Sequence, residues 1–341
     1  MLRLSAVIAA ALLAPGPETV ADEPLRATSV SAFGDYAAWS RWDPSVRRFR
    51  LIIRRTGEAA EYAPVRPRKV PFDVDLGPSG AGAPVAVYSR CRREPPKSYE
   101  PNPLPEWRSA RGCRLFELRL PGGREKRLSL PGSGSAYLPS RWGHRVAFVR
   151  RSGRALGRPV LLDLRTRATT VLRGGRRGAE DDPDFRDPGV FALDLKGRRV
   201  AMNWGYYGEF CPHPEKGLTK SSALYTEIRV ATPDGSARRL AHGCLDVRPS
   251  FVLLAGWRGS DVLFARSTFT YGPTYRTTLA LRDGRARRPR VDLGPIATDR
   301  SNVMSLATAG NRLVSSRQDY DGADFRDRVV ESVYARPTRT E

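Results

Sequence analysis

The residues of this sequence that could carry out chemistry are few, and they form no catalytic motif. Only three histidines occur among 341 residues. No Gly-x-Ser-x-Gly segment is present, which counts against Ser-His-Asp hydrolysis. One acidic cluster stands out, and we expect it to form ion pairs with nearby arginines rather than a catalytic carboxylate pair. Its members are Glu180, Asp181, Asp182, Asp184 and Asp187. We therefore predict no catalytic residue and no cofactor.

A second acidic group resembles part of a calcium-binding loop. Asp319, Asp321 and Asp324 lie close together around Gly322, and carboxylates in a short loop are typical calcium ligands. However, Gly322 comes too early for a helix-flanked calcium loop, and no terminal glutamate follows at the required distance. We expect an exposed turn here and no metal site.

The first residues have the character of an export signal. Arg3 precedes an apolar run from Leu4 to Ala14, two proline breakers follow, and Thr19-Val20-Ala21 places short residues before a plausible cleavage position. We expect residues 1–21 to be a signal peptide and residues 22–341 to form one secreted or extracytoplasmic domain. No later stretch approaches the ~20 apolar residues that a transmembrane helix requires, so the mature chain should contain no such helix.

The chain is strongly basic. It carries 58 basic and 36 acidic residues, a net charge of +22, and six of the basic residues are lysines. A positive field of this size attracts polyanions such as acidic polymers of the cell envelope. The arginines are spread over nearly every segment, and no nucleic-acid-binding module is visible. We expect a protein or an anionic envelope polymer as partner, and no nucleic acid.

The elements that would position any site follow from a short pattern that recurs six times. Each copy consists of a glycine, two variable residues, two small or branched apolar residues and a larger apolar one, and the copies are about 55 residues apart. Glycine suits the tight turn of a hairpin, where φ is positive, and the apolar residues suit the strand that follows. The copies are Gly34–Trp39, Gly82–Val87, Gly143–Phe148, Gly197–Met202, Gly259–Phe264 and, more weakly, Gly310–Ser315.

The segments around these hairpins predict a four-stranded sheet in each repeat. An apolar segment precedes every glycine, and an alternating segment further downstream suits a third strand. Charged fourth strands, suited to exposed edges, follow in four of the repeats. One such sheet cannot cover both of its faces, whereas six sheets arranged radially cover one another. The sequence therefore predicts an all-β fold, a six-bladed β-propeller of four-stranded antiparallel blades.

The repeat resembles that of the TolB-like six-bladed propellers. The resemblance is carried by Gly143–Phe148, followed by Pro159–Leu164 and a basic outer strand, and it extends from Thr28 to Ala335. In that family the hairpin usually begins with Ser-Pro-Asp-Gly, whereas Arg141-Trp142-Gly143 and Lys196-Gly197 stand here. The resemblance implies the fold, and fold analogy alone does not assign an activity.

A propeller of this kind would gather its long connections on one face. With alternating strand directions, the loops from second to third strands and those from fourth strands to the next blade emerge together, and these are the longest loops here. Binding residues are often placed on loops held by a rigid scaffold, so this face is the predicted functional surface. Its aromatic residues could form a platform for a glycan or a peptide, although scattered exposed aromatic residues usually pack against their own loops. They are Trp107, Tyr206, Tyr207, Tyr271 and Tyr275.

Four cysteines are expected to form two structural disulfides. Their number is even, none shows Cys-x-x-Cys spacing, and an exported chain meets an oxidising environment. Three pairings are possible in principle. In the propeller, Cys91 leaves a second strand and Cys113 enters the third strand of the same blade, while Cys211 and Cys244 both lie on the long-loop face. We therefore predict the pairs Cys91–Cys113 and Cys211–Cys244, each contributing on the order of 3 kcal/mol by closing its loop.

Three functional hypotheses remain open at this point. The first is an exported, non-enzymatic, monomeric propeller that binds a protein or an anionic envelope polymer through its long-loop face. The alternative is a hydrolase or lyase of the propeller type, with its site at the mouth of the central channel. The third is a purely structural envelope protein without a concave polar site. Carboxylates or histidines that converge on the axis would favour the enzyme, and an axis lined by small and apolar residues would favour the binding protein.

Overall fold

The computed structural model describes most of the chain, and the described part is built from β-strands without a helix. The described residues are 17–23, 29–94, 110–153, 157–173, 189–207, 210–213, 217–220, 224–244, 250–269, 275–285, 290–297, 300–320 and 325–334. For residues 23, 206–207, 210–213, 217–220, 224, 269, 275 and 325 the description covers the backbone alone. The prediction of an all-β fold is confirmed.

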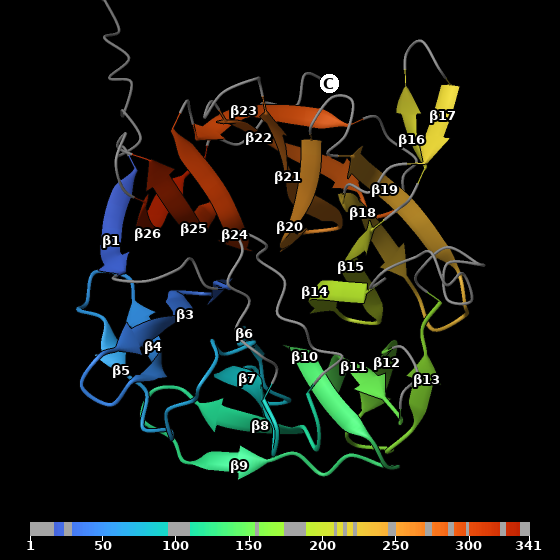
Figure 1. Ribbon diagram of the computed structural model, residues 1–341. Coiled ribbons are helices and arrows are strands. Elements are labelled where there is room, and N and C mark those ends of the chain that lie inside the picture. The colour runs from blue at the N-terminus through green and yellow to red at the C-terminus, as the bar shows by residue number, and fades with distance from the viewer. Residues whose placement is uncertain are drawn as a thin grey trace, which may run out of the picture.

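The described strands form six antiparallel four-stranded blades arranged around a central axis (Figure 1). Blade 1 contains β2 (Ser31–Phe33), β3 (Tyr36–Asp43), β4 (Arg48–Arg55) and β5 (Glu61–Tyr62). Blade 2 contains β6 (Asp75–Pro78), β7 (Pro84–Arg90), β8 (Arg114–Arg119) and β9 (Glu125–Arg127). Blade 3 contains β10 (Ser135–Trp142), β11 (Arg145–Arg151), β12 (Arg158–Asp163) and β13 (Thr169–Val171).

The second half of the chain forms the other three blades. Blade 4 contains β14 (Gly189–Lys196), β15 (Arg199–Tyr207), β18 (Leu224–Ala231) and β19 (Ala237–Cys244). The hairpin of β16 (Phe210–His213) and β17 (Gly217–Lys220) is inserted between its second and third strands. Blade 5 contains β20 (Ser250–Arg258), β21 (Asp261–Phe269), β22 (Tyr275–Asp283) and β23 (Val291–Ala297). Blade 6 contains β24 (Ser301–Ala309), β25 (Arg312–Tyr320), β26 (Phe325–Val333) and β1 (Glu18–Glu23).

The six hairpins lie where the glycine pattern placed them. All six glycines have positive φ, from +55° at Gly34 to +83° at Gly82, which is the conformation that favours glycine. The last residue of each copy is fully buried, because it fills the wedge between neighbouring blades. These residues are Trp39, Val87, Phe148, Met202, Phe264 and Ser315, each 0% exposed. The repeated sequence pattern therefore reflects both the hairpin turn and the packing between neighbouring blades.

The ring is closed by a strand from the other end of the chain. β1 pairs with β26 and supplies the outer strand of blade 6, as Figure 1 shows at the blue and dark red strands. Residues 18–21, which the sequence analysis grouped with the signal peptide, belong to this strand in the structure. Joining the two ends of the chain in one sheet removes the free edge that an open ring of blades would leave.

The strand order also defines the two faces of the ring. Turns between first and second strands and between third and fourth strands lie on one side, here called the tight-turn face. Connections from second to third strands and from blade to blade lie on the other side, here called the long-loop face. The longest breaks between consecutive strands, such as the one from β7 to β8 and the one from β13 to β14, all belong to the long-loop face.

Candidate functional site

A cavity of about 140 Å³ lies on the axis, where the innermost strands of all six blades meet. Its walls are formed mainly by small and apolar residues, and its polar groups include three aspartates, Asp73, Asp75 and Asp194. Asp73 and Asp75 come from blade 2, and Asp194 comes from blade 4. The axial cavity therefore has both the carboxylates that would favour an enzyme and the small and apolar walls that would favour a binding protein.

Asp75 is held by groups from the two neighbouring blades. Its Oδ1 accepts a hydrogen bond from the hydroxyl of Ser31 at 3.0 Å, and its Oδ2 accepts one from the backbone N–H of Arg141 at 3.0 Å. The side chain borders the cavity but is surrounded by the blades, and this burial raises the pKa of Asp75 to about 6. The carboxyl group thus joins blade 2 to the innermost strand of blade 3.

Asp194 joins blade 4 to blade 5 in the same way. Its Oδ2 accepts a hydrogen bond from the backbone N–H of Trp257 at 2.8 Å. Burial, and after it the charge of Asp75, raise the pKa of Asp194 to about 8. Gly256 leaves room for this carboxyl group, because a Cβ built there would stand 2.4 Å from Asp194 Oδ2.

These bonds belong to a wider pattern that joins one blade to the next. An innermost strand has one edge without a neighbouring strand, so its N–H groups need other acceptors. Side chains of the preceding blade provide them. Ser140 Oγ accepts from Leu195 N at 2.8 Å, and Asn203 Oδ1 accepts from Leu254 N at 3.0 Å. At the ring closure, Ser305 Oγ accepts from Val30 N at 3.1 Å. Asp75 and Asp194 are thus structural acceptors.

Replacing Asp194 by asparagine should weaken the dependence of stability on pH between about pH 4 and pH 8. Because the folded-state pKa of Asp194 lies above its ordinary value, the folded state holds this proton more firmly than the unfolded state. The free energy of unfolding should therefore fall as pH rises from about 4 to about 8, by at most about 1.4 kcal/mol per pH unit for each such carboxyl group. Asparagine keeps an acceptor for Trp257 N–H, as Asn203 does for Leu254. Urea unfolding across this pH range measures the effect.

The matched control for this experiment is Asp75→Asn. It removes a carboxyl group whose pKa is raised less, to about 6, and it also removes the charge that helps to raise the pKa of Asp194. The fall in the free energy of unfolding should therefore be weaker than in the original protein and should end at a lower pH. Equal pH slopes for the original protein and Asp194→Asn would contradict the assignment of a raised pKa to Asp194.

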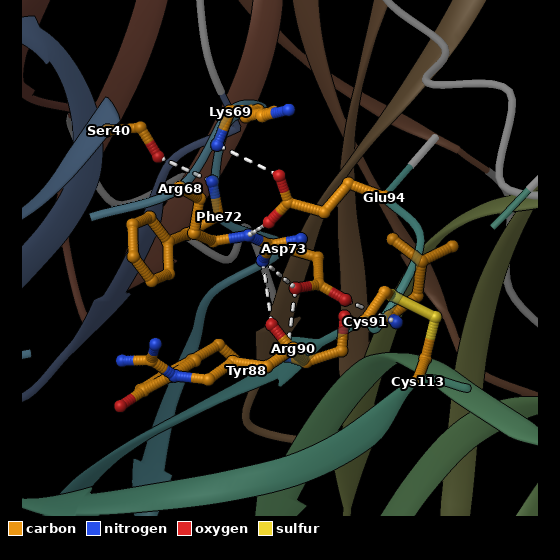
Figure 2. A network of polar contacts seen from close by, with 12 residues as sticks. Ser40, Arg68, Lys69, Phe72, Asp73, Tyr88, Arg90, Cys91, Glu94 and Cys113 are labelled. Carbon is orange, nitrogen blue, oxygen red and sulfur yellow. Dashed lines mark hydrogen bonds and ion pairs between the residues drawn. A yellow bond between two sulfur atoms is a disulfide. The ribbon is translucent and has the colours of Figure 1, made fainter. Parts of the chain in front are cut away.

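A second polar network connects this cavity with the long-loop face (Figure 2). Asp73 Oδ1 lies 3.2 Å from Arg68 Nη1 and accepts the backbone N–H of Ser89 at 2.9 Å. Asp73 Oδ2 accepts the N–H of Leu138 at 2.8 Å. Leu138 has a φ of +49°, in the left-handed region, at the bulge of β10. Asp73 therefore fixes three chain segments at once, one of them in an unfavourable conformation.

Arg68 carries the network outward to the start of the β7–β8 loop. Its Nε lies 3.2 Å from Glu94 Oε1, and its Nη1 donates to the carbonyl of Ser89 at 2.7 Å. Glu94 also accepts the backbone N–H of Lys69 at 2.9 Å. The Arg68 side chain is only 2% exposed, so this ion-pair network is buried.

The two ends of the β7–β8 loop are fastened together. Cys91 and Cys113 form a disulfide, which Figure 2 shows beside the Arg68 network. Arg93 and Arg111 exchange backbone hydrogen bonds of 3.0 and 2.8 Å. Because the disulfide, the backbone bridge and the Glu94 contacts act within a few residues, the base of this loop is rigidly held.

A basic groove lies along this base on the long-loop face. It has a volume of about 690 Å³, and its eleven lining residues include seven basic residues and one acidic residue, Glu94. Arg68 and Arg90 are neutralised by Glu94, Asp73 and Glu125. Five cations have no acidic partner among the residues that the structure describes: Arg48, Arg66, Lys69, Arg92 and Arg93.

The predicted disulfides are confirmed in part. Cys91–Cys113 is present, and Cys244 is disulfide-bonded. The side chain of Cys211 lies outside the described residues, so its pairing with Cys244 stays a prediction. Among described residues, no group of three metal-binding side chains occurs, and no helix is long and apolar enough to cross a membrane.

Most other residues singled out from the sequence lie outside the described part. Trp107 and Tyr271 are not described, and of Tyr206, Tyr207 and Tyr275 the backbone alone is placed, at the long-loop ends of β15 and β22. The acidic cluster of residues 180–187 and the positions 321–324 are also outside. The expected aromatic platform therefore stays a prediction.

Sequence reasoning missed the cavity aspartates and the basic groove. A signal for the first was available, because Asp73, Asp75 and Asp194 interrupt segments that otherwise read as apolar innermost strands. A carboxylate in such a position must accept hydrogen bonds or be protonated. The groove had no comparable signal, because its cations come from three separate segments of a chain in which arginine is common throughout.

Comparison with known proteins finds similarity at the level of the fold. No protein-family model matches the sequence, and no curated protein is similar to it in sequence. TolB from Acinetobacter baumannii is 17% identical, with a TM-score of 0.42, over 88% of this chain and 66% of that chain. The putative TolB from Agrobacterium tumefaciens is 13% identical, with a TM-score of 0.49, over 93% of both chains. A puromycin-hydrolyzing peptidase from Mycobacterium tuberculosis is 15% identical, with a TM-score of 0.48, over 91% of this chain and 51% of that chain.

The prediction of a six-bladed β-propeller is confirmed by the strand order of this chain. TolB proteins are among the solved structures that are similar to it. The chain spans 66% and 51% of the length of two of these proteins. A propeller fold by itself assigns no activity.

Proposed function

We propose that this protein is an exported, non-enzymatic propeller that binds a protein or an anionic envelope polymer through its long-loop face. The observation that carries the proposal is the basic groove on that face, whose walls are held by a disulfide and a buried ion-pair network. A rigid scaffold that presents unpaired cations is suited to recognition, because little ordering is needed on binding. Closure of the ring by its own β1 strand leaves no free blade, which supports a monomer.

The disulfide supports an extracytoplasmic location for this function. Cys91 and Cys113 are joined, and disulfides of this structural kind persist in secreted and periplasmic compartments. An apolar run from Leu4 to Ala14 with a preceding arginine is the character of an export signal. Together these features support a location in which envelope polymers and exported proteins would be its neighbours.

An enzyme with a site in the axial cavity is the second candidate. It is favoured by the raised pKa values of Asp75 and Asp194, since such groups are suited to proton transfer. The hydrogen bonds of these carboxyl groups argue for the structural role instead. Each accepts a backbone N–H of the next blade, so each is required by the fold whether or not a substrate enters the cavity.

Site-specific photo-crosslinking in the cells that make the protein tests the binding proposal. A photoreactive amino acid is placed singly at exposed positions of the long-loop face, Arg92 and Arg93, and at exposed positions of the tight-turn face, Arg165 and Arg198. We expect adducts from the long-loop positions and few or none from the tight-turn positions. Equal adducts from both faces, or none from either, would overturn the proposal.

A further inference from the structure

The basic groove contains several cations that form no ion pair with an acidic residue in the described part of the chain. Arg68 serves the fold, because it is buried and bound to Asp73, Glu94 and the carbonyl of Ser89. The exposed residues Arg66, Lys69, Arg92 and Arg93 have no acidic partner in the described part of the chain. Like charges gathered in one hollow repel one another, so an arrangement of this kind is stabilised by a bound anion.

A second hollow lies next to the groove on the long-loop face, and the two together are here called the track. Arg93 of the groove is joined by backbone hydrogen bonds to Arg111. Arg111 lines the neighbouring hollow of about 430 Å³, together with Arg114 and Arg151. The disulfide adjoins both hollows, because Cys91 lines the groove and Cys113 stands between Gly112 and Arg114 of the second hollow. Two adjoining basic hollows suit a linear anion with repeated charges better than a single small one.

The lining of the groove indicates what kind of anion fits. Protein-binding surfaces usually have an apolar, aromatic-rich centre, whereas the apolar residues of this groove are limited to Pro67, Val70 and Cys91. No aromatic side chain is among its described lining residues, so nucleic-acid bases would find no stacking surface there. Four of the five unpaired cations are arginines, and the guanidinium fork matches the oxygens of a phosphate group.

We infer that this track binds a linear polymer that carries phosphate groups along its backbone. The inference rests on the proposed function and names the ligand class for the same face. Arg66 and Lys69 on one wall and Arg92 and Arg93 on the other contact successive phosphate groups, and the rigid loop base keeps the two walls at a fixed separation. Binding should release counterions and weaken steeply as salt is added.

Binding of long-chain inorganic polyphosphate to the purified full-length protein tests the inference. In the groove variant, Arg66, Lys69, Arg92 and Arg93 are replaced by serine. In the control variant, four exposed arginines of the tight-turn face are replaced by serine: Arg119, Arg124, Arg165 and Arg198. Both variants lose four positive charges from the same total of +22. We expect the groove variant to bind polyphosphate at least roughly tenfold more weakly, with a shallower salt dependence, and the control variant to bind nearly as well as the original protein.

Other outcomes would overturn the inference in distinguishable ways. If both variants lose binding equally, the overall charge is responsible and the track is not a site. If polyglutamate binds as tightly as polyphosphate with the same variant dependence, the groove receives acidic polypeptides and the assigned polymer class is wrong. If polyphosphate does not bind at all, the inference fails, while crosslinks confined to the long-loop face would still uphold the proposed function.

Discussion

Replacing Asp73 by alanine is expected to lower the free energy of unfolding by about 3–5 kcal/mol, because it removes one of the two carboxylate partners of the buried guanidinium of Arg68. The side chains of Arg68 and Asp73 are 2% and 1% exposed. The substitution also removes the acceptor of two backbone N–H groups, those of Ser89 and Leu138. Urea unfolding at neutral pH measures the loss.

The variant Asp73→Asn separates charge from hydrogen bonding. It keeps one oxygen acceptor but removes the negative charge, while Glu94 stays an acidic partner of Arg68 in both variants. We expect a loss between those of the original protein and Asp73→Ala. If Asp73→Ala cost less than about 1 kcal/mol, the value of an ordinary hydrogen bond, the buried network would not be the support of the groove.

The stability of the Asp73 variants is relevant to function, because Asp73 connects the axial cavity to the long-loop face. Arg68 contacts Asp73 on one side and Glu94 on the other, and Glu94 holds the backbone of Lys69. Loss of Asp73 should therefore loosen the groove as well as destabilise the fold. The unpaired cations Arg92 and Arg93 owe their fixed position to the same loop base.

The repeated features of the fold could be predicted from the sequence, because they are local. A glycine turn followed by apolar residues specifies a hairpin within six residues, and its last residue is buried in every blade, from Trp39 to Ser315. The Cys91–Cys113 disulfide followed in the same way, since both residues border one loop of one blade.

The features that were missed depend on contacts between distant segments. Asp73 accepts the N–H of Leu138, 65 residues away, and Asp194 accepts that of Trp257, 63 residues away. Strand alternation shows that a residue faces inward but does not show which blade it meets. The outer strand β1 was missed for a related reason, because Glu18–Glu23 is short, polar and adjacent to the apolar run of the export signal.

Replacing Glu331 by alanine is the second substitution with a large expected effect, because this residue joins the last blade to the first. Its Oε2 lies 2.6 Å from Arg54 Nη1 in blade 1. Its Oε1 lies 2.7 Å from Arg312 Nε in blade 6, an ion pair without hydrogen-bond alignment. The Arg54 and Glu331 side chains are each 10% exposed. Without Glu331, Arg312 has no acidic partner among the described residues, and Arg54 retains Glu18, which is 68% exposed and 3.4 Å away. The substitution should cost about 3–5 kcal/mol, measured by urea unfolding.

A surface ion pair of the same chain provides the control for Glu331. Arg55 and Glu58 lie 3.2 Å apart, but their side chains are 52% and 59% exposed. Solvent screens exposed pairs of this kind, so Glu58→Ala should cost about 0–1 kcal/mol. Equal costs for Glu58→Ala and Glu331→Ala would contradict the role of the buried pair.

Hydrogen exchange can show whether Glu331 acts on ring closure in particular. Arg312 also donates to the carbonyl of Gly34 at 2.9 Å and to Thr56 Oγ1 at 2.6 Å, so both sides of the junction between blades 1 and 6 depend on it. In Glu331→Ala we expect faster exchange in β1, β26 and β4 than in β12 of blade 3. The ring is closed where β1 pairs with β26, and no covalent bond joins these two strands. The stability of this closure must therefore come from such side-chain contacts and from the strand pairing itself. Uniformly faster exchange in all blades would instead mean that the ring opens as one cooperative unit.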